Sequence, residues 1–292
     1  MKSIITFLIV TAIAFAFGVG AGWESIKVGS YSAYFLCVVL AMVINWLVFL
    51  PSAAAKSDTF YDTTGAITYF TVTIIACLIH YQHYGNIDLR SLVIAAMIVI
   101  WCARLGSFLF IRIHAMGGTD SRFEKIKVNP ARFLVAWTLQ GLWVVLTASA
   151  AHVAILAQER ASLDAFFFIG AAVWVFGFVY ESVADAQKSA FKKDPANKGK
   201  FINVGLWKWS RHPNYFGEIT LWTGILIMAI PVLWGLSWLV VISPVFVTLL
   251  LTKVSGVNLQ TAQAKERWGD DPAYQTYLAN TPTLIPRPPK SA

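Results

Sequence analysis

Long apolar runs occupy most of this 292-residue chain, and they constrain its fold more than any other feature. A helix needs about 20 mainly apolar residues to cross a bilayer, and inside lipid it satisfies all of its own backbone hydrogen bonds. Only 13% of the residues are charged, whereas a soluble domain carries about 25%. The runs therefore predict an all-α, polytopic membrane bundle of seven to eight transmembrane helices. The expected spans are 3–21, 32–54, 66–84, 91–113, 133–157, 164–186 and a longer stretch, 219–252.

The last stretch, 219–252, is too long for one span, and two prolines and a glycine interrupt it. We expect it to cross twice as a tight hairpin. Of the 23 basic residues, 17 lie in three polar segments, 112–132, 187–218 and 253–292. Basic loops stay cytoplasmic, so these loops, the short polar C-terminal tail and both termini are predicted on the cytoplasmic side. The net charge of +8 then reflects topology, and no nucleic-acid partner is expected.

The cysteines and histidines do not have the spacing of a metal site. Cys37, Cys77 and Cys102 all lie inside apolar runs, which favours a packing role. His80 and His83 end the third run, where interfacial positions are favoured over metal ligation. We therefore predict no metal.

Ionisable residues inside a span are costly and often functional. Arg104 lies within the fourth run, on the same helical face as Trp101 three residues earlier. Asp62 lies just before the third run, where it could be an acid at the mouth of an apolar cavity. The structural alternatives are a snorkelling or paired Arg104, and a helix start at Asp62.

Two further carboxylates, Glu181 and Asp185, are four residues apart and share one helical face near the end of the sixth span. They could accept hydrogen bonds from ribose hydroxyls or pair with Arg104. The alternative is a solvated helix end.

The most specific motif is the run from Gly205 to Glu218, GLWKWSRHPNYFGE. Arg211 offers a planar fork for phosphate or carboxylate, and His212 adds a donor beside it. A proline next in sequence suits the first turn of a helix, whose free N–H groups would then face an anion. Asn214 and Glu218 share one face of that helix, and Tyr215 lies beside them. The alternative is a polar helix cap with interfacial aromatics.

This RHPNYxGE run resembles the C-terminal signature of the membrane-embedded steroid 5-alpha-reductase superfamily, and in particular its bacterial branch. Three other segments are similar to that branch. They are Trp101-x-x-Arg104-x-Gly106 with Arg112, Asp120-Ser121-Arg122-Phe123, and the tail from Glu266 to Pro286. The resemblance covers roughly residues 60–290. It implies an integral protein of the bacterial inner (plasma) membrane.

The resemblance also implies an enzyme, an NADPH-dependent oxidoreductase that reduces a carbon–carbon double bond of a lipid-soluble enone, steroid-like or isoprenoid-like. Asn214 and Glu218, with Tyr215 beside them, would hold the nicotinamide end of the cofactor. Glu181 and Asp185 would hold its middle. Four basic residues would contact the phosphates or the adenosine of the cofactor: Arg112, Arg122, Arg211 and His212.

In the steroid enzymes, a glutamate of an early span and a tyrosine of a later span polarise the substrate carbonyl. Here these positions fall near Asp62 and Trp101. Tryptophan is not an acid like tyrosine, which leaves the substrate class open. We predict that Asp62 stabilises the developing enolate, with Trp101 and Arg104 supporting it.

The same signature also occurs in membrane methyltransferases of the isoprenylcysteine and phospholipid type, which use S-adenosylmethionine. That activity is the main alternative. The motifs around Trp101 and Asp120, and the excess of basic residues in the polar segments, favour a phosphate-bearing cofactor over S-adenosylmethionine. A lipid-binding protein or transporter is a third class, but no inverted repeat is visible.

Two domains are predicted, an N-terminal transmembrane hairpin over 1–55 and a reductase-like domain over 56–292 whose C-terminal half binds the cofactor. The expected partners are a lipophilic small molecule and membrane lipids.

Overall fold

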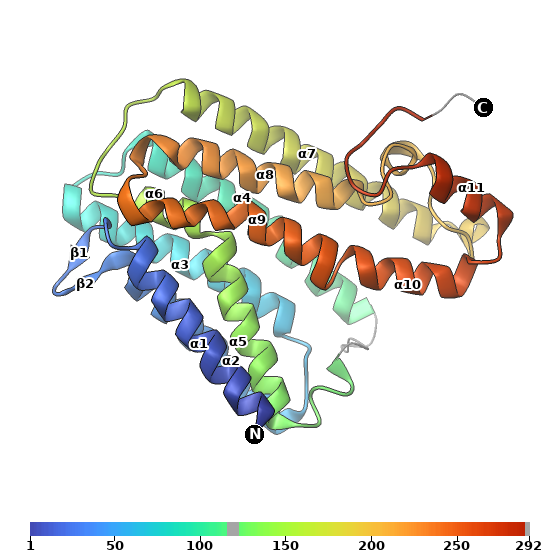
Figure 1. Ribbon diagram of the computed structural model, residues 1–292, viewed down its shortest axis with the longest axis horizontal. Helices are drawn as coiled ribbons and strands as arrows, with labels where there is room; N and C mark the ends of the chain where they lie inside the picture. Colours follow the sequence, from blue (N-terminus) through green and yellow to red (C-terminus); the bar gives the residue numbers. More distant parts are fainter. Residues whose placement is uncertain (116–122, 290–292) are drawn as a thin grey trace. The chain divides into compact units, whose positions relative to one another are not determined.

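The computed structural model describes residues 1–115 and 123–289 (Figure 1). Arg122, one of the predicted phosphate contacts, lies outside the described residues. Seven described helices are long and apolar enough to cross a membrane, or eight spans if one bent pair is counted, which confirms the predicted bundle. The helices are α1 (Lys2–Ala21), α2 (Ala33–Ala55), α3 (Tyr61–Tyr84), α4 (Leu89–Ala115), α5 (Pro130–Thr147), α6 (Ser149–Ile155), α7 (Ala165–Lys193), α8 (Pro213–Ala229), α9 (Ile242–Leu249), α10 (Val257–Trp268) and α11 (Pro272–Asn280).

Short elements connect these helices. Strands β1 (Lys27–Val28) and β2 (Tyr31–Ser32) pair antiparallel. The chain forms two compact units. Unit 1 comprises residues 1–167 and 228–243, and unit 2 comprises residues 168–227 and 244–292. The division expected at residue 55 stays a prediction.

Local chemistry sets several helix ends. The Ser32 hydroxyl accepts a hydrogen bond from the backbone of Phe35 and so caps the start of α2. Asn129 caps α5 in the same way. Gly85 ends α3 with φ of 74°, a left-handed conformation that costs glycine little. Pro213 is the first residue of α8, as its lack of an N–H donor predicts.

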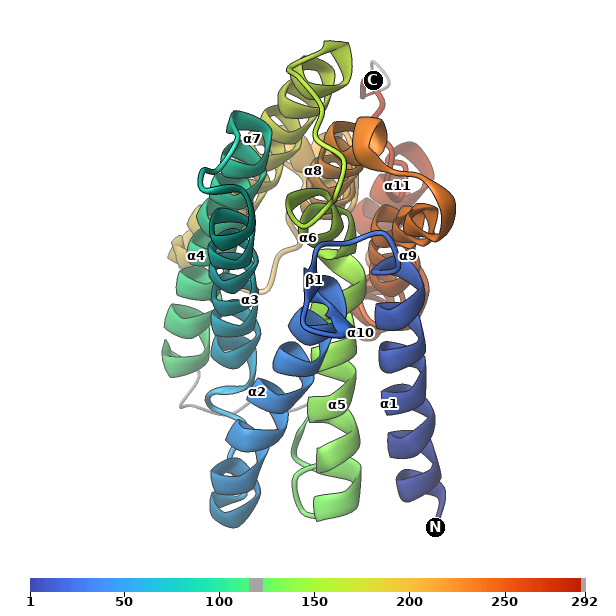
Figure 2. The same ribbon diagram turned by 90° about the vertical axis from the view of Figure 1, so that its left-hand side faces the viewer.

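In unit 1, α2 packs against α3 and α5, α1 packs against α5, and α3 runs beside α4 (Figure 2). A core cluster of Phe123, Phe133 and Trp137 lies at one end, where the Tyr61 hydroxyl donates to the Ala136 carbonyl at 2.9 Å. A salt bridge of 2.7 Å joins Lys127 to the buried Asp58. These contacts hold the start of α3 against α5.

The span predicted at 133–157 is bent rather than straight, because α5 and α6 meet at 56°. No proline or glycine lies at the bend. Instead, the Ser149 hydroxyl donates to the Leu146 carbonyl at 2.8 Å, and the Ser243 hydroxyl donates to the Thr147 carbonyl. Hydroxyl groups therefore satisfy carbonyls that the break leaves without helical partners.

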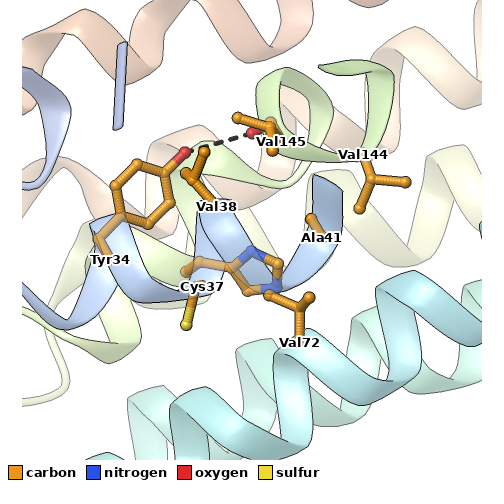
Figure 3. A pocket seen from close by; sticks show the side chains of 8 residues that line it. Tyr34, Cys37, Val38, Ala41, Val72, Val144 and Val145 are labelled. Carbon is orange, nitrogen blue, oxygen red and sulfur yellow. Dashed lines mark hydrogen bonds between the residues drawn. The ribbon is translucent and has the colours of Figure 1, made fainter. Parts of the chain in front are cut away.

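A small pocket in unit 1 lies among α2, α3, α5 and α6 (Figure 3). Its polar groups are already paired. The Tyr34 hydroxyl donates to the Val145 carbonyl at 3.3 Å, and His152 Nε2 lies 3.0 Å from the Thr73 hydroxyl. None of the predicted site residues lines this pocket, so we treat it as a packing defect.

In unit 2, α7 and α8 approach so closely that only glycine fits at the contact. A Cβ on Gly177 would lie 2.5 Å from the backbone nitrogen of Leu221, and one on Gly217 would lie 2.6 Å from that of Glu181. Contacts below 3.0 Å are essentially never seen for real Cβ atoms. Backbone thus packs on backbone where Glu181 lies beside the first turns of α8.

The long stretch predicted to cross twice divides as expected, with α8 ending at Ala229 and a second apolar run over Gly235–Trp268. This second run is irregular. It contains α9, a π-helical turn over Leu250–Val254, and α10. Beyond it, α11 packs its tyrosines against Phe201, whose ring centroid lies 5.0 Å from that of Tyr274.

Candidate cofactor-binding site

The loop before α8 is anchored to α7 and to α11 within unit 2. The Gln187 side chain accepts a hydrogen bond from the backbone of Leu206 at 2.8 Å. The Trp207 indole donates to the Ala184 carbonyl at 3.0 Å, and the Trp207 carbonyl accepts from the Tyr277 hydroxyl at 2.7 Å. The loop is therefore held in one conformation just before the helix begins.

The C-terminal tail runs along the same loop. The Arg211 backbone donates to the Pro282 carbonyl at 2.9 Å, and the Ser210 hydroxyl donates to the Leu284 carbonyl at 2.8 Å. One Nη of Arg211 donates to the Thr283 hydroxyl. The tail motif noted in the sequence thus has a structural role, because it fixes the backbone and one edge of Arg211.

Buried nitrogen atoms lie at the start of α8. His212 is only 6% exposed, and its Nδ1 has no hydrogen-bond partner among the described residues. Within the same described part of the chain, Nε of Arg211 also lacks a partner although it is buried. Buried polar atoms are normally hydrogen-bonded. Because they lie at the start of a helix, these atoms suit an anion.

The charges around His212 are positive. Burial, the largest cause, and the nearby charges of Lys188 and Arg211 together lower the pKa of His212 to about 3. The imidazole is therefore neutral at physiological pH, and two cationic side chains, those of Lys188 and Arg211, lie near it. We call Lys188, Arg211 and His212 the basic cradle.

Lys188 was not singled out in the sequence. Its Nζ lies 4.7 Å above the Trp207 ring and 3.4 Å from Oε1 of Gln260. Gln260 Nε2 donates to the Tyr215 hydroxyl at 2.5 Å, and the Tyr215 ring stacks on His212 with centroids 5.3 Å apart and an interplanar angle of 3°. Side chains from α7, α8 and α10 thus form one connected group.

Two carboxylates lie beside this group. Glu181 is 2% exposed and Asp185 is 9% exposed. Asp185 Oδ1 accepts a hydrogen bond from Asn214 Nδ2 at 3.2 Å, which links the end of α7 to the first turn of α8. Glu218 lies one turn after Asn214 on α8 and is partly buried. Unit 2 therefore brings together all seven of the cofactor residues predicted in this part of the chain.

The other predicted residues belong to unit 1. Nη2 of Arg112 on α4 lies 3.6 Å from Oδ2 of Asp62 on α3. Trp101 is 3% exposed, and its ring meets that of Tyr69 edge-on with centroids 5.2 Å apart. Arg104 lies on α4, one turn beyond Trp101, and is partly buried. The roles of these residues stay predictions.

The sequence missed three contributors to the site, Lys188, Gln260 and Thr283. Each lies outside the RHPNYxGE run and reaches the site only through folding. Lys188 carried a weak signal, because it is three residues after Asp185 and so lies close to the same helical face.

These features define a class, a polytopic α-helical membrane protein with a basic cradle at the start of one of its last long helices. The chain matches the family described as "Protein of unknown function (DUF1295)" over residues 48–281, and it belongs to that family.

Two curated relatives are similar to parts of the chain. The uncharacterized protein C594.04c of Schizosaccharomyces pombe is 29% identical over 175 residues, which cover 49% of this chain and 51% of the relative. The probable O-methyltransferase ustE of Ustilaginoidea virens is 30% identical over 118 residues, which cover 35% of this chain and 41% of the relative. The chain thus spans about half or less of the length of these relatives. No solved structure matches it.

Proposed function

We propose that this protein is a membrane-embedded reductase that binds NADPH at the basic cradle and reduces a carbon–carbon double bond of a lipid-soluble enone. The observation that supports the proposal most strongly is the cluster of Lys188, Arg211 and His212, with two buried nitrogens that lack partners among the described residues. A phosphate group supplies several acceptor oxygens and a negative charge, which match what these atoms lack.

Different residues of unit 2 would bind different parts of such a cofactor. Arg211 presents a guanidinium whose outer edge is fixed by Thr283, which orients the buried Nε. Neutral His212 offers one N–H donor and one acceptor. The carboxylates of Glu181 and Asp185 are acceptors suited to ribose hydroxyls, and Asn214 and Glu218 suit the carboxamide of a nicotinamide.

When bound, NADPH would supply the hydride for the reduction. The chain would supply orientation and an apolar, water-poor surrounding. Charge develops on the substrate carbonyl oxygen only in the transition state, so groups aimed at that oxygen accelerate the step. We assign this role to Asp62, Trp101 and Arg104 on the strength of the sequence. A proton from Asp62 or from water completes the reduction.

Methyl transfer from S-adenosylmethionine is the second candidate, because a relative matching 118 residues is named a probable O-methyltransferase. The cradle argues against it. S-adenosylmethionine carries a sulfonium cation, one carboxylate and no phosphate, so it matches the positive charges of Lys188 and Arg211 less well than NADPH, which carries three phosphates.

Thermal unfolding of the detergent-purified protein with each ligand separates the two activities. We expect a higher Tm with NADPH, a smaller rise with NADH, which lacks one phosphate, and no change with S-adenosylmethionine. A rise with S-adenosylmethionine alone would replace the reductase with the methyltransferase.

A further inference from the structure

Two segments of unit 2 lie side by side where the C-terminal tail passes the loop before α8. The Trp209 carbonyl accepts a hydrogen bond from the backbone N–H of Arg287 at 2.9 Å. The Ser210 hydroxyl donates to the Leu284 carbonyl at 2.8 Å, and the contact of Arg211 with the tail continues this pairing. The partners follow one another in opposite order along the two segments, so the loop and the tail together build one antiparallel surface.

Large apolar side chains of this surface are exposed. Trp209 is 42% exposed and Ile285 is 66% exposed. Two basic residues next to them, Lys208 and Arg287, are exposed as well. Single exposed apolar residues are ordinary, but tryptophan and isoleucine combined with lysine and arginine are typical of surfaces that lie at a bilayer interface. We call these four residues the docking patch.

The charge of the docking patch is not neutralised within the folded chain. No carboxylate of the described residues lies within salt-bridge distance of Lys208 or Arg287. The segment 192–208 contains five lysines and one acidic residue, Asp194, whose carboxylate accepts hydrogen bonds within its own turn. Beyond α11 the tail contains no acidic residue. The docking patch therefore attracts anions.

The place of the docking patch along the chain brings it close to the membrane. Trp209 is four residues before Pro213, the first residue of α8 and of a candidate span. The preceding span, α7, ends with Lys192 and Lys193 in its last turn. Tryptophan favours the level of the lipid headgroups, and basic residues next to the end of a span are attracted by anionic lipids.

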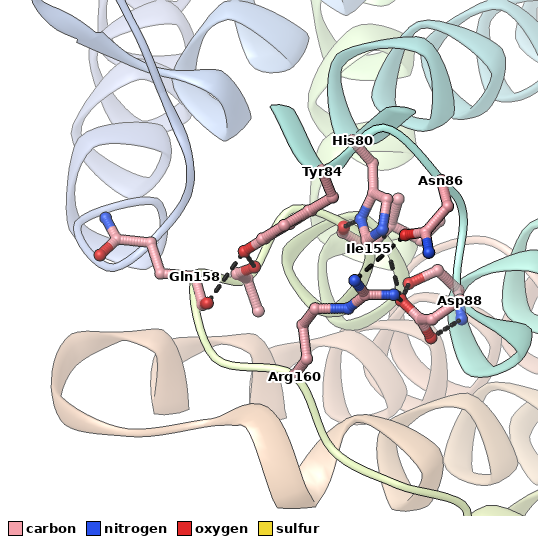
Figure 4. Close-up of polar contacts among 9 residues, drawn as sticks. His80, Tyr84, Asn86, Asp88, Ile155, Gln158 and Arg160 are labelled. Atoms are coloured by element: carbon pink, nitrogen blue, oxygen red, sulfur yellow. Dashed lines mark hydrogen bonds and ion pairs between the residues drawn. The ribbon is translucent and has the colours of Figure 1, made fainter. Parts of the chain in front are cut away.

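The charged residues of unit 1 at the end of α3 are arranged differently (Figure 4). Nη2 of Arg160 lies 3.5 Å from Oδ2 of Asp88, and Nη1 donates to the Asn86 side chain at 3.2 Å. The guanidinium also lies 4.9 Å from the centroid of the Tyr84 ring. This cation already has an acidic partner within the chain, whereas the two cations of the docking patch have none among the residues described.

We propose that the docking patch binds the anionic phospholipid headgroups of the bilayer that surrounds the protein. Trp209 and Ile285 insert among the lipids, and Lys208 and Arg287 contact the phosphates. The bilayer then holds the C-terminal tail against the loop before α8. This inference concerns a surface of unit 2 and depends neither on the cofactor nor on the reaction.

The test follows a nitroxide label at position 285 of the full chain in lipid nanodiscs. The I285C variant can be labelled selectively, because the three native cysteines are buried. We compare phosphatidylcholine alone with a mixture that contains about 30% phosphatidylglycerol. Collisions with a water-soluble paramagnetic reagent report the free label. We expect phosphatidylglycerol to raise the ratio of membrane-bound to free label about 10- to 30-fold, the effect of two basic residues near the surface, and high salt to reverse it.

Two double variants then separate the docking patch from general charge. K208Q/R287Q should lose most of the response to phosphatidylglycerol. K265Q/R267Q removes the same charge from exposed residues of α10 and should keep the response. A label that is equally accessible to water in both lipids overturns the proposal, and so does an equal loss in the two double variants. The comparison of lipids and salt uses the labelled protein alone, so it decides the matter even where a double variant does not fold.

Discussion

The basic cradle depends on a few side chains whose polar atoms are enclosed. Arg211 is fixed by the C-terminal tail through Pro282 and Thr283, so its guanidinium is oriented before any ligand arrives. Such preorganisation reduces the ordering cost of binding. The motif predicted Arg211 and His212 as anion ligands, because their chemistry is visible in the side chains themselves. Only a weak signal marked Lys188, because its contacts depend on how α7 packs.

Lys188 gives the first prediction. Replacing it with glutamine removes one positive charge from the cradle, and NADPH affinity should fall about tenfold, the equivalent of one charge-assisted hydrogen bond. K193Q removes an exposed lysine of the same helix and should leave affinity within about twofold, the scale of a weak surface interaction. Fluorescence titration with NADPH measures both. Equal losses in the two variants would mean that general charge, and not a specific contact, governs binding.

His212 gives a prediction on pH. Its pKa in the folded protein, about 3, lies below the ordinary value of 6.5. The stability from burying it neutral is therefore fully present above pH 6.5 and is lost as pH falls toward 3. H212N should flatten this acid-side loss in a series of Tm measurements between pH 7 and 4. An unchanged slope in H212N would show that the imidazole is not buried in its neutral form.

Among the elements, the contact between α7 and α8 sets the geometry of the site. Gly177 and Gly217 let the two backbones meet, and this contact places Glu181 against the first turns of α8. Gly217 is part of the RHPNYxGE run, but the sequence does not show which helix it packs against. The bend between α5 and α6 was missed altogether, because no proline or glycine marks it and the hydroxyl groups of Ser149 and Ser243 that satisfy carbonyls there come into place only through folding.

Gly217 gives the element-scale prediction. In G217A the new methyl would lie 2.6 Å from the Glu181 backbone nitrogen, so the helices must separate. We expect a stability loss of about 1–3 kcal/mol, typical of overpacking, together with weaker NADPH binding. G20A is the control, because there the nearest atom is the end of a flexible side chain, Leu239 Cδ1. Thermal unfolding measures the stability loss of both variants, and titration measures their NADPH affinity. A G217A protein that equals G20A in stability and in NADPH affinity would contradict the close contact between α7 and α8.

For the molecule as a whole, hydropathy predicted the number of spans because a bilayer-crossing helix must be long and apolar whatever it packs against. The relation of each helix to its neighbours depends on side-chain packing and could not be predicted. Sidedness rests on charge alone. We propose that the segment 187–218, with seven of the basic residues, faces the cytoplasm, and that the end of α3 faces the opposite side.

Labelling with a membrane-impermeant thiol reagent tests this topology. The three native cysteines are buried, so background should be low. In right-side-out vesicles we expect H83C to react at once and K198C to react only after permeabilisation. The reverse pattern would invert the orientation and place the cradle away from cytoplasmic NADPH.

The most direct test of the central claim is calorimetric titration of NADPH into the purified protein in lipid nanodiscs. We predict saturable binding at one site per chain for the wild type and for K208Q, which lacks an exposed lysine of the same loop. The double variant R211Q/H212N should show no saturable binding while remaining folded by circular dichroism. NADPH binding of equal affinity in the double variant, or none in the wild type, would contradict the assignment of the start of α8 as the phosphate site.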